Sequence, residues 1–203
     1  MRKPVTEVNF WQVVPSALTF IILGCGSLFL YPSWTWFGGL GVRAIILGCV
    51  LGIAMYALPF YFLCTPRLRP VSMEVVMQNL RAMFLNLTWP QIIVLSVLAG
   101  IGEELLLRAW LQTWLHTKTG PWLAIFLASL VFGLLHFMNI AYVLITFVAG
   151  VVLGVAFYYS NSLILVATAH VVYDVCAFAM IVKFPHMLGL QSKDEFNNPN
   201  SQE

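Results

Sequence analysis

Six apolar runs of similar length follow one another along this chain, and they constrain its fold more than any other feature. A helix needs about 20 apolar residues to cross the hydrocarbon core of a bilayer, and each run reaches or approaches that length. We therefore predict an all-α fold, a polytopic transmembrane helix bundle of about six spans that forms one membrane domain over residues 1–203. The runs cover residues 13–31, 42–64, 91–115, 121–137, 142–159 and 163–182.

The scarcity of charge points to the same class of protein. Only 9% of the residues are charged and 61% are hydrophobic, whereas soluble domains carry about 25% charged residues. This composition excludes a soluble domain, a disordered chain and a nucleic-acid-binding protein, because the surface cannot face water throughout. Within the runs, Gly48-xxx-Gly52 and Gly150-xxx-Gly154 are small-xxx-small patterns that allow close helix packing.

Lysine and arginine gather near both ends of the chain and between the second and third runs. Six spans place these three segments on one side, which the positive-inside rule predicts to be the cytoplasm. We expect both termini in the cytoplasm, and the compact layout is typical of a bacterial cytoplasmic (inner) membrane protein. The cations of these segments are Arg2, Lys3, Arg67, Arg69, Arg81, Lys183 and Lys193, while Lys118 is the main charge outside.

Two segments outside the runs have distinct patterns. Residues 65–90 mix charged and apolar side chains, which predicts an amphipathic helix on the membrane surface; an ordinary charged loop is the alternative. Residues 183–203 form a polar tail, which we expect to be disordered because it has too little apolar surface to bury.

A small set of ionisable side chains lies inside the apolar runs, where charge is costly. The spacing of four residues between Glu104 and Arg108, and again between His170 and Asp174, places each pair on one helical face. We therefore predict that three helices turn these groups inward around one polar pocket. The set comprises Glu103, Glu104, Arg108, His136, His170 and Asp174.

A structural explanation exists for several of these groups taken singly. Glu104 and Arg108 can form a buried ion pair, His136 can be an ordinary interface residue, and a hydrogen bond can join His170 to Asp174. Glu103 has no local cation left to pair with. The full set exceeds what packing needs, which favours a shared functional site.

The chemistry of the set suits hydrolysis. No serine or cysteine stands beside a base in these segments, so a covalent nucleophile is not indicated. A carboxylate with a nearby histidine can deprotonate a water molecule, and polar groups of another helix can stabilise the developing oxyanion. A zinc site formed by Glu103, His136 and His170 is the alternative, although the H-E-x-x-H pattern of many zinc proteases is absent.

Three motifs occur in order over residues 96–180. They are Glu103-Glu104 followed by Arg108, Phe132 followed by His136, and His170 followed by Asp174. Together they resemble the E-E-x-x-x-R, F-x-x-x-H and H-x-x-x-N/D motifs of the CAAX prenyl protease type II and bacteriocin-processing family, also called Rce1-like or Abi membrane proteases. The motif-bearing core is about residues 91–182.

The resemblance implies a glutamate-type intramembrane endopeptidase that needs no cofactor. Glu103 would be the general base on water with help from His136, and His170 with Asp174 would stabilise the oxyanion. Glu104 and Arg108 would shape the site, and Phe132 would pack behind His136. Its substrate would be a membrane-associated or lipidated peptide or protein, with the bilayer as the other partner and no nucleic acid.

One position departs from the eukaryotic-like members, which have asparagine where this chain has Asp174. A carboxylate donates a hydrogen bond only when protonated. We therefore hypothesise that Asp174 accepts the ring N–H of His170 and that His170 is the main donor to the oxyanion.

Two other functions compete with the protease. Buried carboxylates and histidines also form proton relays in transporters, but the repeated halves typical of many transporters are not evident in the sequence. A non-catalytic membrane immunity or scaffold protein could keep the protease fold, although every motif position is retained.

Overall fold

Helices form nearly all of the chain that the computed structural model describes, which is residues 10–30, 41–65, 67 and 69–190. No strand occurs among these residues, so the all-α prediction is confirmed. Four helices are long and apolar enough to cross a bilayer. They are α1 (Phe10–Leu30), α2 (Val42–Cys64), α7 (Ile140–Ser160) and α8 (Leu163–Val182).

The other two predicted spans are also helical, but they differ from these four. The third is a continuous helix made of α4 (Trp89–Glu104), the π-helical segment η2 (Leu105–Gln112) and α5 (Thr113–Thr119). Its first turn is fixed by a capping box between Thr88 and Gln91. The fourth, α6 (Pro121–Leu135), has 15 residues and is short for a span.

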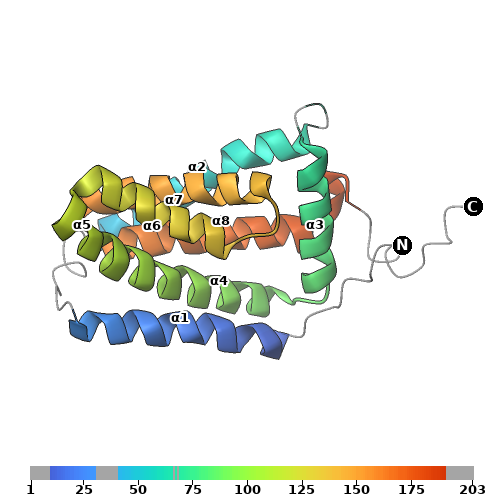
Figure 1. The fold of residues 1–203 in the computed structure, drawn as a ribbon. Coiled ribbons are helices and arrows are strands. Elements are labelled where there is room, and N and C mark those ends of the chain that lie inside the picture. The colour runs from blue at the N-terminus through green and yellow to red at the C-terminus, as the bar shows by residue number, and fades with distance from the viewer. Residues whose placement is uncertain (1–9, 31–40, 66, 68, 191–203) are drawn as a thin grey trace, which may run out of the picture.

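Helix α3 (Val71–Phe84) occupies the segment where the sequence predicts an amphipathic helix. It lies across one end of the bundle (Figure 1). Arg81 Nη1 donates to the carbonyl of Ile181 at 2.8 Å, and Asn139 Nδ2 donates to the carbonyl of Ser72 at 2.8 Å. These bonds fasten α3 to the end of α8 and to the loop that precedes α7.

Glycines permit the closest helix crossings. A Cβ added at Gly48 would lie 2.6 Å from the carbonyl oxygen of Leu165, and one at Gly52 would lie 2.5 Å from that of Ala169. These distances are far below van der Waals contact, so α2 approaches α8 this closely only because both positions lack a side chain. The first small-xxx-small pattern therefore packs α2 against α8, where α8 bears His170.

The ordered chain continues past α8. A short 3-10 helix (Pro185–Leu188) follows, and Leu188 and Leu190 are buried against Met77 of α3. Of the polar tail that we predicted to be disordered from residue 183, residues 183–190 are therefore structured, because Leu188 and Leu190 pack under α3. Residues 191–203 lie outside the described part of the chain.

Candidate active site

A fully buried chain of hydrogen bonds joins α4, η2 and α8. Arg108 Nε donates to Glu104 Oε2 at 3.1 Å, and the other oxygen, Glu104 Oε1, lies 3.0 Å from His170 Nδ1. The side chains of Glu104 and Arg108 are 0% exposed and that of His170 is 4% exposed. Glu104 thus has a partner at each oxygen, as a buried charge requires, and it fixes the orientation of the His170 ring.

Glu103 lies between the two histidines. Its Oε2 atom is 3.8 Å from His136 Nε2 and 4.0 Å from His170 Nε2. These separations exceed a direct hydrogen bond, but a single water molecule can bridge polar atoms this far apart. The carboxylate of Glu103 and both imidazoles can therefore contact the same water or substrate atom.

His136 is held at the end of α6 by its own helix. Its Nδ1 atom lies 2.9 Å from the carbonyl oxygen of Phe132, so this nitrogen carries the proton in the neutral ring. Nε2 is then free to accept a hydrogen bond from a water molecule on the side that faces Glu103. The Phe132 ring lies 4.6 Å from the His136 ring and 5.6 Å from the His170 ring. Phe132 thus packs against both imidazoles.

Asp174 lies one turn beyond His170 on α8. Its Oδ2 atom is 3.6 Å from His170 Nε2, which is longer than a hydrogen bond, whereas Glu104 is within hydrogen-bond distance of the other ring nitrogen. The nearer carboxylate partner of His170 is therefore Glu104. Our hypothesis that Asp174 accepts a ring N–H stays a prediction.

The π-helical turn of η2 begins directly after Glu104 and is a feature that the sequence did not predict. Such turns are rare and often occur at functional sites. Here Arg108 and Gln112 both point to the interior, and Gln112 Nε2 donates to the carbonyl of Gly154 at 2.9 Å. A Cβ at Gly154 would lie 2.9 Å from Gln112 Oε1 and 3.7 Å from Arg108 Nη1. Gln112 therefore ties η2 to α7 close to the buried Arg108.

The candidate site borders a cavity of about 40 Å³ between α2, α6, α7 and α8, which we refer to as the catalytic pocket of the candidate site. It is lined by Phe132, His136, His170 and Asp174 of the motifs. Helices α2 and α7 contribute residues that the sequence analysis missed, because ordinary side chains in an apolar run carry no signal of a site. They are Met55 of α2 and Tyr142, Thr146, Ala149 and Leu153 of α7. Tyr173 of α8 lines the cavity as well.

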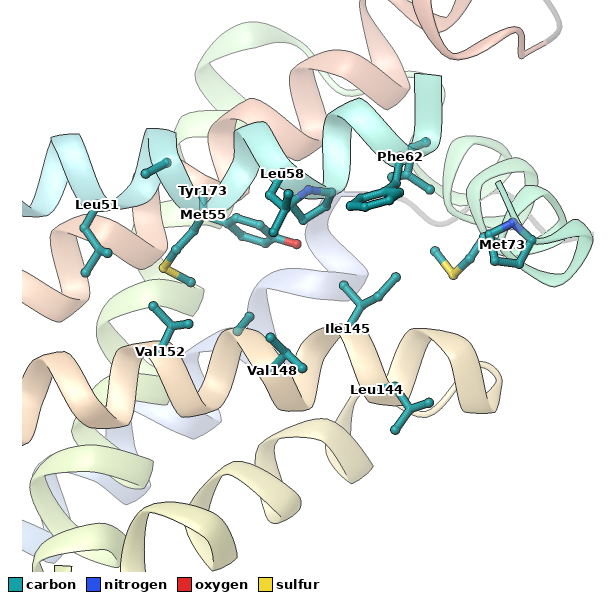
Figure 2. A pocket seen from close by; sticks show the side chains of 15 residues that line it. Leu51, Met55, Leu58, Phe62, Met73, Leu144, Ile145, Val148, Val152 and Tyr173 are labelled. Carbon is teal, nitrogen blue, oxygen red and sulfur yellow. The ribbon is translucent and has the colours of Figure 1, made fainter. Parts of the chain in front are cut away.

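An apolar groove of about 610 Å³ adjoins this pocket (Figure 2). It runs between α2 and α7 and is closed at one end by Pro70 and Met73 near the start of α3. Its outer rim includes Leu58, Leu144 and Val148, each about 60% exposed on helices long and apolar enough to span a bilayer. The groove therefore opens towards lipid.

The predicted site residues thus come together from three helices. Among the described residues, no group of three or more histidine, cysteine, aspartate or glutamate side chains is arranged to hold a metal ion. The arrangement offers one carboxylate flanked by two imidazoles, with a second, firmly held carboxylate behind it.

Comparison with known proteins gives a family match for the part of the chain that contains the three motifs. Residues 85–176 match the family described as type II CAAX prenyl endopeptidase, Rce1-like. The match spans Glu103, His136 and His170, and it agrees with the resemblance carried by the three motifs. No protein of curated description and no solved structure matches the chain.

Proposed function

The chain carries an Rce1-like domain over residues 85–176, and from this premise we propose that it is a membrane endopeptidase that hydrolyses with Glu103 and His136. The observation that supports this mechanism is the position of Glu103 Oε2 between His136 Nε2 and His170 Nε2, at 3.8 and 4.0 Å. A water molecule held there would have a base on one side and an imidazole on the other.

In the proposed reaction Glu103 takes a proton from water as the oxygen attacks the substrate carbonyl. The carbonyl bond pair moves onto oxygen, and His170, with Asp174 beside it, stabilises this oxyanion. The tetrahedral intermediate then collapses, the C–N bond breaks, and the proton held by Glu103 passes to the leaving amine. His136 positions the water through Nε2, since its Nδ1 is occupied by the Phe132 carbonyl. No metal ion takes part in this scheme.

The substrate we propose is a membrane-associated or lipidated peptide or protein that reaches the site from the bilayer. The groove between α2 and α7 supports this route, since it is apolar, opens towards lipid and adjoins the catalytic pocket. We further propose that the protein resides in a bacterial cytoplasmic membrane with both termini in the cytoplasm, as the distribution of lysine and arginine indicates.

Cleavage by purified protein tests the assignment. Membrane-peptide substrates are offered to wild type, Glu103→Gln and His136→Ala in detergent. Glu74→Gln is the control, because Glu74 of α3 pairs with Arg69 and lines neither cavity. We expect both site variants to lose about 10²–10⁴-fold in kcat, the usual contribution of a general base, and the control to match wild type. The assignment of the site is wrong if Glu103→Gln cleaves like wild type.

Two further measurements separate the alternatives. We expect cleavage activity to survive a strong chelator. Activity that the chelator abolishes and added zinc restores would instead favour a zinc site formed by Glu103, His136 and His170. Proton-coupled uptake into liposomes without any cleavage would contradict the protease and favour a proton relay.

A further inference from the structure

The apolar groove and the catalytic pocket share one wall. Both are lined by Met55 of α2, Ala149 of α7 and Tyr173 of α8. Figure 2 shows Met55 and Tyr173 next to each other, with Val148 and Val152 across the groove. These three shared residues are the boundary that a substrate from the groove must pass, and we refer to them as the aperture.

The pocket behind the aperture is too small for a peptide in the described conformation. A volume of about 40 Å³ holds a few water molecules, since one needs roughly 10–15 Å³, whereas ligand pockets usually measure about 300–1,000 Å³. The groove, at about 610 Å³, falls within that range. A substrate therefore fits the groove as it stands and reaches Glu103 only if the aperture widens.

The three side chains of the aperture differ in size and in conformational flexibility. Met55 is unbranched and flexible, so it can change rotamer at low cost. Tyr173 is held against Tyr56, with ring centroids 6.3 Å apart, and it lies one residue before Asp174. Ala149 has the smallest side chain of the three, so it leaves the most room on the α7 side.

The register of α7 places Ala149 at the boundary. Thr146 and Leu153 line only the catalytic pocket, and Val148 and Val152 line only the groove, while Ala149 lines both. A residue larger than alanine at this position would project directly into the opening, whereas one at Val148 would project into the groove alone.

We propose that Met55, Ala149 and Tyr173 determine substrate specificity by size: an apolar segment of the substrate occupies the groove, and only a small side chain next to the scissile bond passes the aperture. This inference rests on the proposed protease function. It assigns part of the choice of substrate to Met55 of α2 and Ala149 of α7, two helices that carry none of the three sequence motifs.

Selectivity among matched peptides tests the inference. Internally quenched peptides with an apolar flank carry alanine, leucine or phenylalanine at the cleaved bond. We expect wild type to prefer the alanine peptide. Met55→Ala should raise kcat/KM for the phenylalanine peptide about tenfold relative to the alanine peptide, and Ala149→Leu should lower kcat/KM for the leucine and phenylalanine peptides about tenfold relative to the alanine peptide. Pocket size differences of one or a few methylenes have effects of this order. Val50→Leu, at an exposed position of α2 that lines neither cavity, is the matched control and should leave the ratios unchanged. Equal alanine-to-phenylalanine ratios in wild type, Met55→Ala and Ala149→Leu would overturn the inference.

A binding measurement keeps this test independent of turnover. The same apolar peptide with photoreactive leucine at the varied residue is bound to Glu103→Gln protein, and crosslinks are mapped by mass spectrometry. We expect crosslinks at Met55 and Tyr173 that Ala149→Leu removes and Val50→Leu preserves. Crosslinks only at other residues would overturn the inference even if cleavage is observed. If wild type cleaves no peptide, the proposed function fails, and the crosslinks alone decide whether the aperture binds the substrate.

Discussion

Arg108 neutralises a carboxylate that has no access to water. Its Nε donates to Glu104 and both side chains are 0% exposed. Removing one partner of such a pair leaves an uncompensated buried charge, which costs about 3–5 kcal/mol. We therefore expect Arg108→Ala to lower the unfolding midpoint in detergent strongly, whereas Arg43→Ala, at an exposed position on α2, should change it little.

Removal of both charges separates stability from activity. Replacement of a buried ion pair by apolar or neutral groups of similar volume is often tolerated, so Glu104→Gln with Arg108→Met should regain most of the stability lost in Arg108→Ala. Its cleavage activity should stay low, because the carboxylate that holds His170 Nδ1 at 3.0 Å is gone. Recovery of both stability and activity would show that Glu104 has no part in orienting His170.

Two variants of Asp174 separate the contribution of its charge from that of its hydrogen bonding. Asparagine keeps the size and hydrogen-bonding capacity of the side chain and removes its charge. We expect Asp174→Asn to stay within about tenfold of wild type in kcat/KM and Asp174→Ala to lose about 10²–10³-fold, the usual effect of losing an oxyanion donor or its support. If the asparagine variant is as inactive as the alanine variant, the carboxylate charge is the requirement.

At the scale of helices, close packing of α2 on α8 positions the site. A Cβ at Gly52 would lie 2.5 Å from the carbonyl oxygen of Ala169, next to His170, while one at Gly26 on α1 would have nothing within 4 Å. We expect Gly52→Ala to destabilise the protein by about 1–3 kcal/mol through overpacking and to reduce activity. Gly26→Ala should be neutral or stabilising by about 0.5–1 kcal/mol, since alanine favours a helix interior. Equal shifts in unfolding midpoint for the two variants would contradict a close α2–α8 contact as the cause.

The helices could be predicted from the sequence because the bilayer allows few solutions. Long apolar runs must be helical to satisfy their backbone in lipid, and ionisable groups within them must turn inward. This is why residues 103–108, 132–136 and 170–174 could be expected to meet. The π-helical turn of η2 could not, since π-helices are rare and no residue pattern in this run signals one.

The pairing within the site also depends on information that spacing lacks. The sequence suggests Asp174 as the partner of His170 because the two are four residues apart, but the rotation of α4 against α8 brings Glu104 closer to His170 Nδ1. Met55 and Tyr142 were missed for a related reason. Their side chains are common in any span, and only the packing of α2 and α7 places them at the pocket.

At the scale of the whole molecule, the ends of the bundle differ in charge. Arg67 lies in the connection to α3 and Lys118 lies in α5, and α3 and α5 are at opposite ends of the bundle (Figure 1). The excess of arginine on the α3 side predicts that this end faces the cytoplasm. Since His136 ends α6 in the loop that Asn139 ties to α3, this orientation would place the His136 end of the pocket towards the cytoplasm.

Thiol labelling in intact bacterial cells measures this orientation. Arg67→Cys and Lys118→Cys are made in a chain whose four cysteines are replaced by alanine, since both positions are exposed. We expect a membrane-impermeant maleimide to label position 118 in intact cells and position 67 only after permeabilisation, because the α3 end is held inside by its arginines. Labelling of position 67 alone would mean that the bundle is inverted, and the His136 end of the pocket would then face the opposite side of the membrane. Labelling of both in intact cells would contradict a spanning arrangement of the helices between them.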